Sequence, residues 1–388
     1  MKMNQDLKEQ IIQYAKKIGI DKIGFTSADP FLELKEILIR HRELGYESGF
    51  EEKDLDKRTN PKLSLENAKS IIAIAIAYPS KIVSPPKSTK GEYRGFVSRS
   101  AWGLDYHLIL HEKLNLLGRY LKELVPSAEY VVMSDTGVLS DHAVAERAGI
   151  GWIGKNSLLI SPEFGSYVYL GEMVTNISFP EDQPMENQCG DCTRCINACP
   201  TQAIVSPYQV NGKQCLSYIT QRKDMLEEHW MEKLGNRIYG CDTCQIVCPK
   251  NKGINSMHHE LTRPNPELAK PLLKPLLTIS NKEFKQTWGK TSAAWRGKKT
   301  LQRNAIIGLA HFKDESSLPL LKEILEKDKR PMIRQTTAWA IGKIRGQQAK
   351  EILESVKFKE KEEKVLAEIN KSLKRLANQD IADSPNKK

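Results

Sequence analysis

The sequence predicts a mixed α+β chain that contains a cysteine-rich segment and ends in a helical repeat region. Strand and helix patterns are mixed over residues 1–180, without the regular cadence of parallel βαβ units. All eight cysteines of the 388-residue chain fall within residues 189–248. Beyond them, small residues recur in helical segments with a period of about 32 residues. We therefore expect domains at 1–180, 181–255 and 256–378, and a disordered tail at 379–388.

The first elements follow from hydrophobic periodicity. Apolar side chains recur on one helical face over residues 7–18, and Gly19 is a natural helix stop. A strand is expected over residues 21–26 and a second amphipathic helix over residues 31–44. Residues 71–78 alternate β-branched with small side chains, which is typical of a central strand covered on both faces.

The rest of the N-terminal region predicts two more helices and further strands. Residues 81–99 are rich in Pro, Ser, Lys and Arg and predict an exposed basic loop. A leucine stripe then predicts a helix over residues 110–124 with an apolar core face. A short strand is expected at 130–133, a helix capped by Ser140 at 141–148, and a hairpin of residues 156–160 and 166–175.

The cysteine spacing predicts iron–sulfur ligands. The first run follows the C-x2-C-x2-C-x3-C-P pattern of bacterial ferredoxins, with Pro200 after its fourth cysteine. A lone cysteine and a second, shorter run ending before Pro249 follow it. The eight residues are Cys189, Cys192, Cys195, Cys199, Cys215, Cys241, Cys244 and Cys248. Four ligands per cluster make two [4Fe–4S] clusters with no cysteine left over.

The ferredoxin rule also predicts how the cysteines pair. In two-cluster ferredoxins the fourth cysteine of each run binds the cluster of the other run. One cluster would then be held by Cys189, Cys192, Cys195 and Cys248. The other would be held by Cys199, Cys215, Cys241 and Cys244, where Cys215 replaces the ligand that the second run lacks. Structural zinc is the main alternative, but its C-x2-C knuckles do not usually carry a third cysteine or the following proline. Disulfides would require an oxidising compartment.

Composition bounds the class of protein. The N-terminus is charged rather than signal-like, and the longest apolar run, residues 71–78, is much shorter than a membrane span. We therefore expect a cytoplasmic protein without a membrane partner. The formal net charge of +11 favours polyanionic partners, nucleic acid first, although many basic proteins bind none.

A basic segment precedes the C-terminal repeat, whose units at 305–312 and 337–344 resemble HEAT-like helix pairs. A final helix is expected at 360–377. The basic segment could track phosphates while its tryptophan stacks on a base, or it could be a solvated helix face. Its residues are Trp295, Arg296, Lys298, Lys299 and Arg303.

Two further stretches are candidates for chemistry. Asp135 follows the strand at 130–133, where an Asx-turn is the favoured local interpretation and a proton donor is the functional one. The glycine-rich turn at 149–156 predicts close backbone approach, but it matches neither the P-loop nor the dinucleotide fingerprint. The D-x-H-x-x-G pattern of many cobalamin binders is absent, because Leu110 follows Asp105 and His107 where glycine is required.

Together these residues resemble the epoxyqueuosine reductase family over nearly the whole chain. The resemblance is carried by Asp135-Thr-Gly, by residues 145–156, 165–173 and 239–245, by the split cysteine set, and by residues 295–299. It implies a cobalamin-binding α+β domain without a cobalt ligand from the protein, two [4Fe–4S] clusters that feed electrons to cobalt, and a C-terminal module that holds a tRNA anticodon stem. The implied activity is the last step of queuosine synthesis on tRNA.

By the same resemblance, low-valent cobalt acts on the epoxide carbon, Asp135 protonates the oxygen as the ring opens, and loss of water leaves the cyclopentene. We expect burial beside the corrin to raise the pKa of Asp135. Residues 216–240 are expected to help cover the corrinoid. The corrinoid contacts implied are Arg58, Ser98, Asp135, Leu159, Leu170, Ser217 and Asp242.

The electron donor expected is of flavodoxin or ferredoxin type, and the protein is expected to be a monomer. Two other functions remain open at this point. One is a corrinoid-dependent, dehalogenase-like reductase of a small molecule. The other is a non-catalytic iron–sulfur scaffold whose repeats bind a protein partner.

Overall fold

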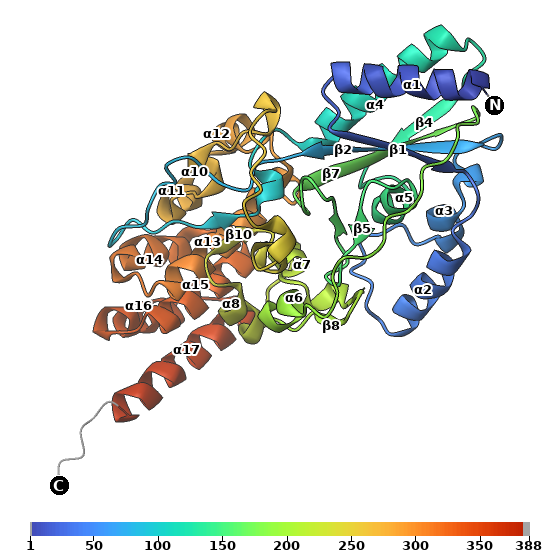
Figure 1. Cartoon of the computed structure of the whole chain (residues 1–388). Helices are drawn as coiled ribbons and strands as arrows, with labels where there is room; N and C mark the ends of the chain where they lie inside the picture. Colours follow the sequence, from blue (N-terminus) through green and yellow to red (C-terminus); the bar gives the residue numbers. More distant parts are fainter. Residues whose placement is uncertain (1, 383–388) are drawn as a thin grey trace. The chain divides into compact units, whose positions relative to one another are not determined.

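The computed structural model describes residues 2–382, which form two compact units (Figure 1). One, here called the sheet unit, contains the chain up to residue 82 together with residues 99–215 and 242–264. The other, the helical unit, contains residues 83–98, 216–241 and the chain from residue 265 onward. The sequence predicted consecutive domains instead. The chain crosses between the units several times, so the cysteine-rich segment is divided between them.

The sheet unit is built on four antiparallel strands in the order β1-β2-β7-β4. The strands are β1 (Lys22–Ser27), β2 (Ser70–Ala77), β7 (Val168–Thr175) and β4 (Tyr130–Met133). Every residue of β2 is buried, because its alternating isoleucines and alanines face two packed layers. The prediction of a central strand at this position is confirmed.

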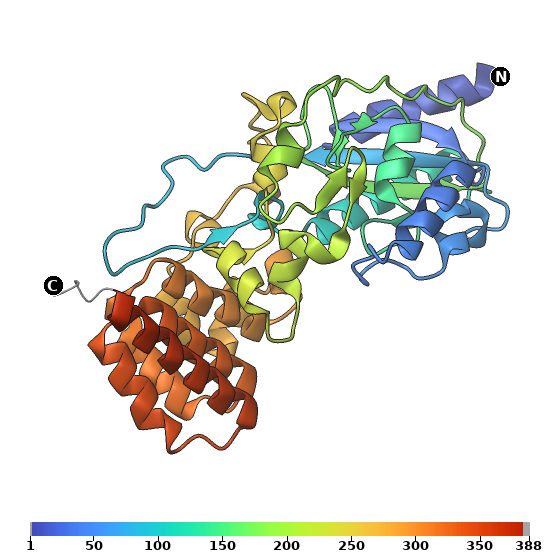
Figure 2. The ribbon, with the colours of Figure 1, turned by 90° about the horizontal axis from the view of Figure 1, so that it is seen from below.

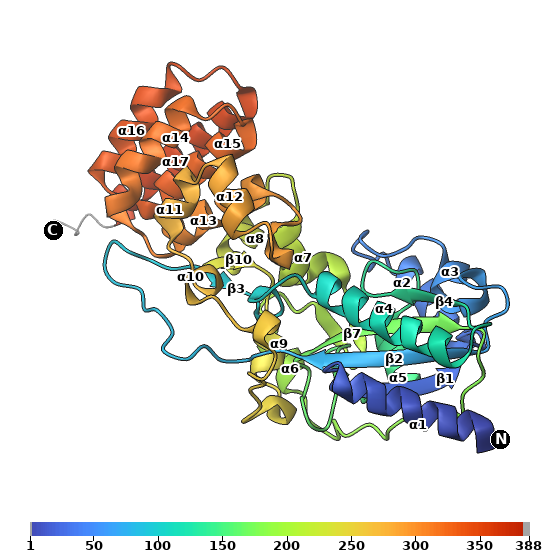
Figure 3. The same cartoon turned by 90° about the horizontal axis from the view of Figure 1, so that it is seen from above.

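Helices cover both faces of this sheet (Figures 1 and 3). On one face lie α1 (Lys2–Lys17) and α4 (Tyr106–Leu124), and the predicted leucine stripe of α4 is fully buried at Leu110, Leu114, Leu117 and Leu121. On the other face lies the short helix α5 (Asp141–Arg147), whose Val144 packs with alternate side chains of β2 and β7. The mixed α+β class follows directly.

The predicted hairpin of residues 156–160 and 166–175 is wrong. The short strand β6 (Leu159–Ile160) pairs with β5 (Trp152–Ile153), while β7 pairs with β2 and β4 in the middle of the main sheet. Burial of β7 on both faces selects the central position over a local hairpin. Ser140 occupies the N-cap position of α5 as expected, but its side chain makes no capping hydrogen bond.

The remaining elements of the sheet unit are short. They are α2 (Leu32–Glu43), α3 (Leu55–Thr59), α6 (Arg194–Ala198), β8 (Ile204–Ser206), β9 (Gln209–Val210) and α9 (Thr243–Ile246). The helices α6 and α9 carry the two cysteine runs and pack against each other, which brings sequence-distant cysteines into one region.

The helical unit begins with α7 (Leu216–Gln221), α8 (Glu228–Leu234) and a two-stranded parallel pair of β3 (Phe96–Val97) and β10 (Arg237–Tyr239). Stacked helices follow in rows (Figure 2). They are α10 (Pro266–Ala269), α11 (Leu273–Thr278), α12 (Asn281–Thr287), α13 (Lys298–His311), α14 (Leu318–Lys327), α15 (Pro331–Ile344), α16 (Gln347–Lys357) and α17 (Glu363–Ala382).

The small residues of the predicted repeat lie where helices pack closely. A Cβ added to Gly342 would come within 2.6 Å of Ser372 Cβ on α17, and one added to Gly308 would lie 3.0 Å from Leu273 Cδ1. The predicted repeat thus reflects helix contact. The predicted disorder of residues 379–382 is wrong, because α17 continues to Ala382, and residues 383–388 lie outside the described residues. None of the described helices is long and apolar enough to cross a membrane.

Candidate active site

One cavity of the sheet unit is lined by four thiols. Cys189, Cys192 and Cys195 from the first run and Cys248 from the second run surround it. Burial raises the pKa values of Cys195 and Cys248, and the neighbouring thiols add to the shift. Four sulfur donors around one space are the donor set that a [4Fe–4S] cluster requires. The cavity brings together the four cysteines predicted to share a cluster.

Cys199 has a different environment. Its Sγ accepts a hydrogen bond from the Ala203 N–H at 3.2 Å and lies 3.6 Å from Thr201 Oγ1. Burial acts to raise the pKa of this thiol, but hydrogen bonds from Thr201, Ile204 and Ala203 outweigh it and lower the pKa. The thiolate, which is the form that binds iron, is therefore favoured before any metal arrives.

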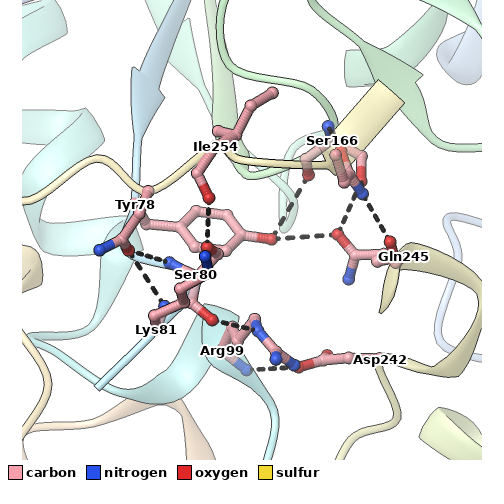
Figure 4. A network of polar contacts seen from close by, with 10 residues as sticks. Tyr78, Ser80, Lys81, Arg99, Ser166, Asp242, Gln245 and Ile254 are labelled. Atoms are coloured by element: carbon pink, nitrogen blue, oxygen red, sulfur yellow. Dashed lines mark hydrogen bonds and ion pairs between the residues drawn. The ribbon is translucent and has the colours of Figure 1, made fainter. Parts of the chain in front are cut away.

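A buried polar network fixes the second cysteine run to the sheet (Figure 4). Asn251 Nδ2 donates to Ser166 Oγ at 2.9 Å and to the Gln245 carbonyl at 2.8 Å, and Asn251 Oδ1 accepts the Ser166 N–H at 2.8 Å. Ser166 Oγ also lies 2.9 Å from Gln245 Oε1. Because Ser166 precedes β7, these bonds hold the backbone around Cys244 and Cys248 against the sheet.

Asp242, between two predicted ligands, is tied to Arg99 in the same network. Only 1% of Asp242 is exposed, and its Oδ2 accepts from the Arg99 N–H at 2.9 Å and from Arg99 Nη1 at 2.8 Å. Arg99 Nε in turn donates to the Ser80 carbonyl at 2.7 Å. The Asp242 side chain is thus occupied by Arg99, and any corrinoid contact from this residue would fall to its backbone. Sequence reasoning missed Arg99.

Asp135 lies in the loop between β4 and α5. Its φ of +44° is unusual for a residue other than glycine and is tolerated best by Asp and Asn. The side chain is 60% exposed, so the carboxylate can meet a bound molecule. Tyr106 donates its hydroxyl to Asp135 Oδ2 at 2.5 Å, and His107 Nε2 lies 3.3 Å from the same oxygen, in an ion-pair geometry rather than an aligned hydrogen bond.

The expected rise in the pKa of Asp135 is wrong for this structure. Partial burial acts to raise the pKa, but the contacts with His107 and Tyr106 outweigh it and lower the pKa. Asp105, the N-cap of α4, lies 2.7 Å from His107 Nδ1. Asp105 and then Asp135 raise the pKa of His107 to about 9. At neutral pH the proton therefore resides on His107, in contact with the Asp135 carboxylate.

Tyr106 and His107 are site residues that sequence reasoning missed. The sequence contains a signal for them, because Asp105 and His107 stand at the first two fixed positions of the D-x-H-x-x-G pattern, which this chain does not complete. In the fold the same two residues orient a proton beside Asp135. Tyr106 also stacks on Tyr169 of β7 with ring centroids 4.9 Å apart, which locks the donor to the sheet.

The other predicted corrinoid contacts are dispersed. Leu159 and Leu170 are buried in the core between the sheet and α5, with 2% and 8% exposure. Arg58 is half-buried, and this burial lowers its pKa. Arg58 makes no side-chain hydrogen bond with another residue of the described chain, so its guanidinium can donate hydrogen bonds to an anionic or carbonyl group of a ligand. Ser98 and Ser217 belong to the helical unit.

The glycine-rich turn approaches protein rather than ligand. A Cβ added to Gly151 would lie 2.3 Å from the Ile160 carbonyl oxygen, and one added to Gly149 would lie 2.6 Å from the Gln183 carbonyl oxygen. Gly149 also has φ +70°. Backbone packing thus explains both glycines, and the predicted close approach is internal.

The predicted nucleic-acid residues of the helical unit differ in their availability. Lys299 and Trp295 are exposed, and Trp295 Nε1 donates to Gln221 Oε1 at 2.7 Å. Arg296 Nε donates to the Gln221 carbonyl at 2.8 Å, and Lys298 Nζ donates to the Ile279 carbonyl at 3.0 Å. This cluster therefore presents one exposed indole ring and one exposed lysine, with two partly engaged cations beside them.

Arg303 is a correction to the predicted phosphate-binding stripe. Its side chain is fully buried, and burial lowers its pKa to about 9. The guanidinium donates to backbone carbonyls at the end of α7 and in the segment that follows it. These bonds go to Ile219, Thr220, Arg222 and Asp224 at 2.6–3.4 Å. Arg303 therefore holds residues 219–224 in place and is not available to a phosphate.

We expect Arg303→Ala to destabilise the protein by roughly 3–5 kcal/mol, because it leaves several buried carbonyls without a donor. Urea unfolding followed by circular dichroism measures the change. Lys299→Ala, four residues earlier on α13 but exposed, serves as the control and should stay within about 0.5 kcal/mol of the parent. Equal unfolding midpoints for the parent and Arg303→Ala would contradict the structural role.

The fold and the cysteine set define an iron–sulfur oxidoreductase with an appended HEAT-like domain. Family models agree with this class: the 4Fe-4S double cluster binding domain matches residues 188–251, Epoxyqueuosine reductase QueG matches residues 58–136, and HEAT repeats match residues 296–374. A relative from Bacillus anthracis, named epoxyqueuosine reductase, is 57% identical over 373 residues, which is 96% of this chain and 98% of the relative. The chain belongs to the epoxyqueuosine reductase family.

Solved structures of relatives agree in fold. A crystal structure of epoxyqueuosine reductase with an epoxyqueuosine-modified tyrosine tRNA stem loop is 56% identical with a TM-score of 0.94, and the match covers 96% of this chain and 99% of that one. A structure of the Bacillus subtilis enzyme, described with its catalytic loop swung out of the active site, is 55% identical with a TM-score of 0.93 and the same coverage.

Proposed function

We propose that this oxidoreductase reduces epoxyqueuosine to queuosine at the wobble position of tRNA, with cobalamin and two [4Fe–4S] clusters as cofactors. The observation that carries the proposal is the Asp135 carboxylate held against protonated His107 in a unit that also gathers cluster-forming thiols. Removal of the epoxide oxygen consumes two electrons and two protons per product and releases one water. The chain supplies ligands for electron carriers and a group that holds a proton.

The protein's part in the proton transfer follows from the contacts of Asp135. His107 Nε2 holds a proton 3.3 Å from Asp135 Oδ2, and the Tyr106 hydroxyl shares that oxygen. As negative charge develops on the epoxide oxygen, His107 transfers its proton to the Asp135 carboxylate, and Asp135 passes that proton to the oxygen. This pair works near neutral pH although the pKa of Asp135 is low, because the pKa of His107 is about 9.

Cobalamin fits the predicted residues of the sheet unit by its chemistry. Arg58 offers a half-buried cation and Asp135 an exposed carboxylate, neither of which is a neutral nitrogen or sulfur donor that would bind cobalt, whereas Leu159 and Leu170 are buried in the core. Bound cobalamin would supply a strongly reducing metal centre for opening the epoxide. The exposed carboxylate of Asp135 would face the reacting group, as its 60% exposure permits.

The thiols would hold two clusters in the predicted pairing, and the polar network around Asn251 supports rigid placement of the second run. An electron donor of flavodoxin or ferredoxin type would reduce them. A cytoplasmic location and a monomeric state belong to the same proposal. The loop around Asp135 would correspond to the loop that is called catalytic in the Bacillus subtilis structure.

The tRNA would be held by the basic helical unit, with Trp295 and Lys299 as its exposed contacts. Lys299→Ala should lower the slope of log K against log salt for an anticodon stem loop by about 0.7–0.9, the contribution of one phosphate contact. Fluorescence anisotropy at several salt concentrations measures this slope. Lys16→Ala on α1 removes the same charge elsewhere and should leave the slope unchanged. An unchanged slope for Lys299→Ala would remove this lysine from the interface.

The direct test of the function is product identification. Reduced protein reconstituted with iron, sulfide and cobalamin is incubated with epoxyqueuosine-containing tRNA, which is then digested to nucleosides and analysed by mass spectrometry. Queuosine should form only when cobalamin and reductant are both present. Epoxyqueuosine that survives intact under these conditions would refute the proposal, and turnover without cobalamin would refute its cofactor assignment.

A further inference from the structure

Two carboxyl groups, those of buried Glu172 and partly buried Asp141, lie at the Asp135 loop. Glu172 is on β7 opposite Met133, the last residue of β4, and only 1% of it is exposed. It shares a face of β7 with Leu170 and Val174, which pack toward α5. Asp141 begins α5 and is hydrogen-bonded to Glu172. The two acids thus meet where the loop leaves the sheet.

Asp141 contacts the loop itself. Its Oδ2 accepts the backbone N–H of Asp135 at 2.6 Å. Asp135 has a φ of +44°, in the left-handed region, so the loop needs an external partner to hold that conformation. Asp141 is therefore placed to fix the backbone of the proposed acid without touching the reacting groups.

The pair holds a proton at neutral pH. Two carboxylates in one buried site cannot both be ionised at low cost. Burial and then the Asp141 charge raise the pKa of Glu172 well above its ordinary value, and Glu172 Oε1 finds no donor among the described residues. The pKa of Asp141 is raised to about 7, chiefly by burial, while the hydrogen bonds from Asp135 N–H and Glu172 oppose the rise. Glu172 is therefore the protonated partner.

We infer that Glu172 and Asp141 are positioning residues for the proposed reaction: protonated Glu172 donates to the Asp141 carboxylate, and Asp141 holds the Asp135 loop through the Asp135 N–H. This inference rests on the proposed role of Asp135, which it deepens. Neither acid touches substrate. Ionised Asp141 accepts the N–H more strongly than its protonated form does, so the loop should be held best above the pKa of Asp141.

Other charged groups face this pair and enter its pH dependence. From the loop comes Asp135, whose charge raises the pKa of Asp141. From α4 comes His107, which acts through Asp135, and from α5 comes His142, whose pKa burial lowers. From α3 comes Arg58, which Asp141 attracts. His107 titrates near 9 and so does not obscure a transition near 7.

The first readout needs no cofactor or substrate. Hydrogen exchange of the 134–139 peptide, corrected for intrinsic rates, is measured between pH 6 and pH 8. Asp141→Ala should speed exchange at the Asp135 amide at least about tenfold, with β7 unchanged, because only the loop loses its partner. Asp141→Asn keeps an oxygen acceptor that does not titrate. In this variant the exchange protection of the Asp135 amide should therefore stay constant when the pH is lowered below 7, whereas in the parent it should decrease.

The second readout is catalytic. Asp141→Ala should lower kcat for the tRNA stem loop about 10- to 100-fold with KM within about twofold, because misplacement of an acid affects the reacting state rather than binding. Glu172→Gln keeps a donor to Asp141 and should retain the parental profile. Glu172→Leu removes that donor, so the acid limb of kcat should move to higher pH.

Parental loop exchange together with a parental kcat profile in Asp141→Ala would overturn the inference. If that variant fails to fold, Asp141→Asn decides the matter: an acid limb identical to the parent's would overturn the inference, and its disappearance would support it. Failure of the proposed function gives a different result, since the parent protein itself would then leave epoxyqueuosine intact while the loop-exchange differences persisted.

Discussion

Asp135→Ala should reduce turnover of epoxyqueuosine-tRNA by about 10²–10⁴-fold, the range that a positioned general acid contributes. The substitution removes a carboxylate that contacts both Tyr106 and His107. His107 would keep its proton, but no group would remain to pass it to the epoxide oxygen. Single-turnover conversion, followed by mass spectrometry of the nucleoside, measures the loss.

The controls for this result separate chemistry from assembly. The Asp135→Ala protein should keep the visible absorbance of its clusters and of bound cobalamin, because Asp135 is not one of the residues that line the thiol cavity. Asp135→Asn keeps the shape and should be similarly inactive, whereas Thr136→Ala on the same loop should stay within about threefold of the parent, as exposed substitutions usually do. Substantial activity in Asp135→Asn would contradict the acid role.

The pH dependence has a defined direction. His107 has a raised pKa of about 9, so its proton is present below that pH and is lost as the pH rises through it. The rate of the chemical step should therefore fall on the alkaline side near pH 9. His107→Gln should lower the rate throughout and remove this limb. A limb that persists unchanged in His107→Gln would assign the proton to another group.

Paired cysteine substitutions should have the second large effect, on iron content and on activity. Cys189→Ala with Cys248→Ala removes two ligands of one predicted cluster and should leave about four irons per chain. Cys189→Ala with Cys215→Ala removes one ligand from each predicted cluster and should lose nearly all iron if one missing thiolate prevents assembly. Both variants should be inactive, because the electron path needs both clusters.

The comparison tests pairing rather than mere cluster binding. Iron and sulfide are quantified chemically and compared with electron paramagnetic resonance of the reduced protein. The cavity that joins Cys248 to Cys189, Cys192 and Cys195 is the structural reason for the expected difference. If the Cys189/Cys248 variant lost all iron while the Cys189/Cys215 variant kept about half, the pairing would have to be reversed.

Local sequence patterns were sufficient for much of the fold. The alternation at residues 71–78 predicted a central strand covered on both faces, and the leucine stripe after residue 110 predicted a helix with a buried face. Each pattern shows which faces of an element are buried away from water. The hairpin around residue 162 was wrong because strand partners are chosen by burial across the whole sheet. Local turn residues could not reveal that β7 pairs with β2 and β4.

For the site, the residue type identified Asp135 but not its chemistry. The sequence suggested a buried acid with a raised pKa, whereas Tyr106 and His107 lower the pKa and move the proton onto His107. Arg303 looked like a phosphate contact because it is basic and follows other basic residues. Its position on α13 turns it inward to the carbonyls of residues 219–224, which only the packed structure reveals.

The sequence by itself determined the cysteine ligand set, the mixed α+β class and the helical repeat, since ligand spacing and hydrophobic period are properties of the chain. The tertiary structure alone decided which groups share a proton. Asp105, His107 and Asp135 meet across α4 and the loop after β4, and Asp141 meets Glu172 across α5 and β7. A pKa depends on burial and on neighbouring charges, and both are set by contacts between segments that are distant along the chain.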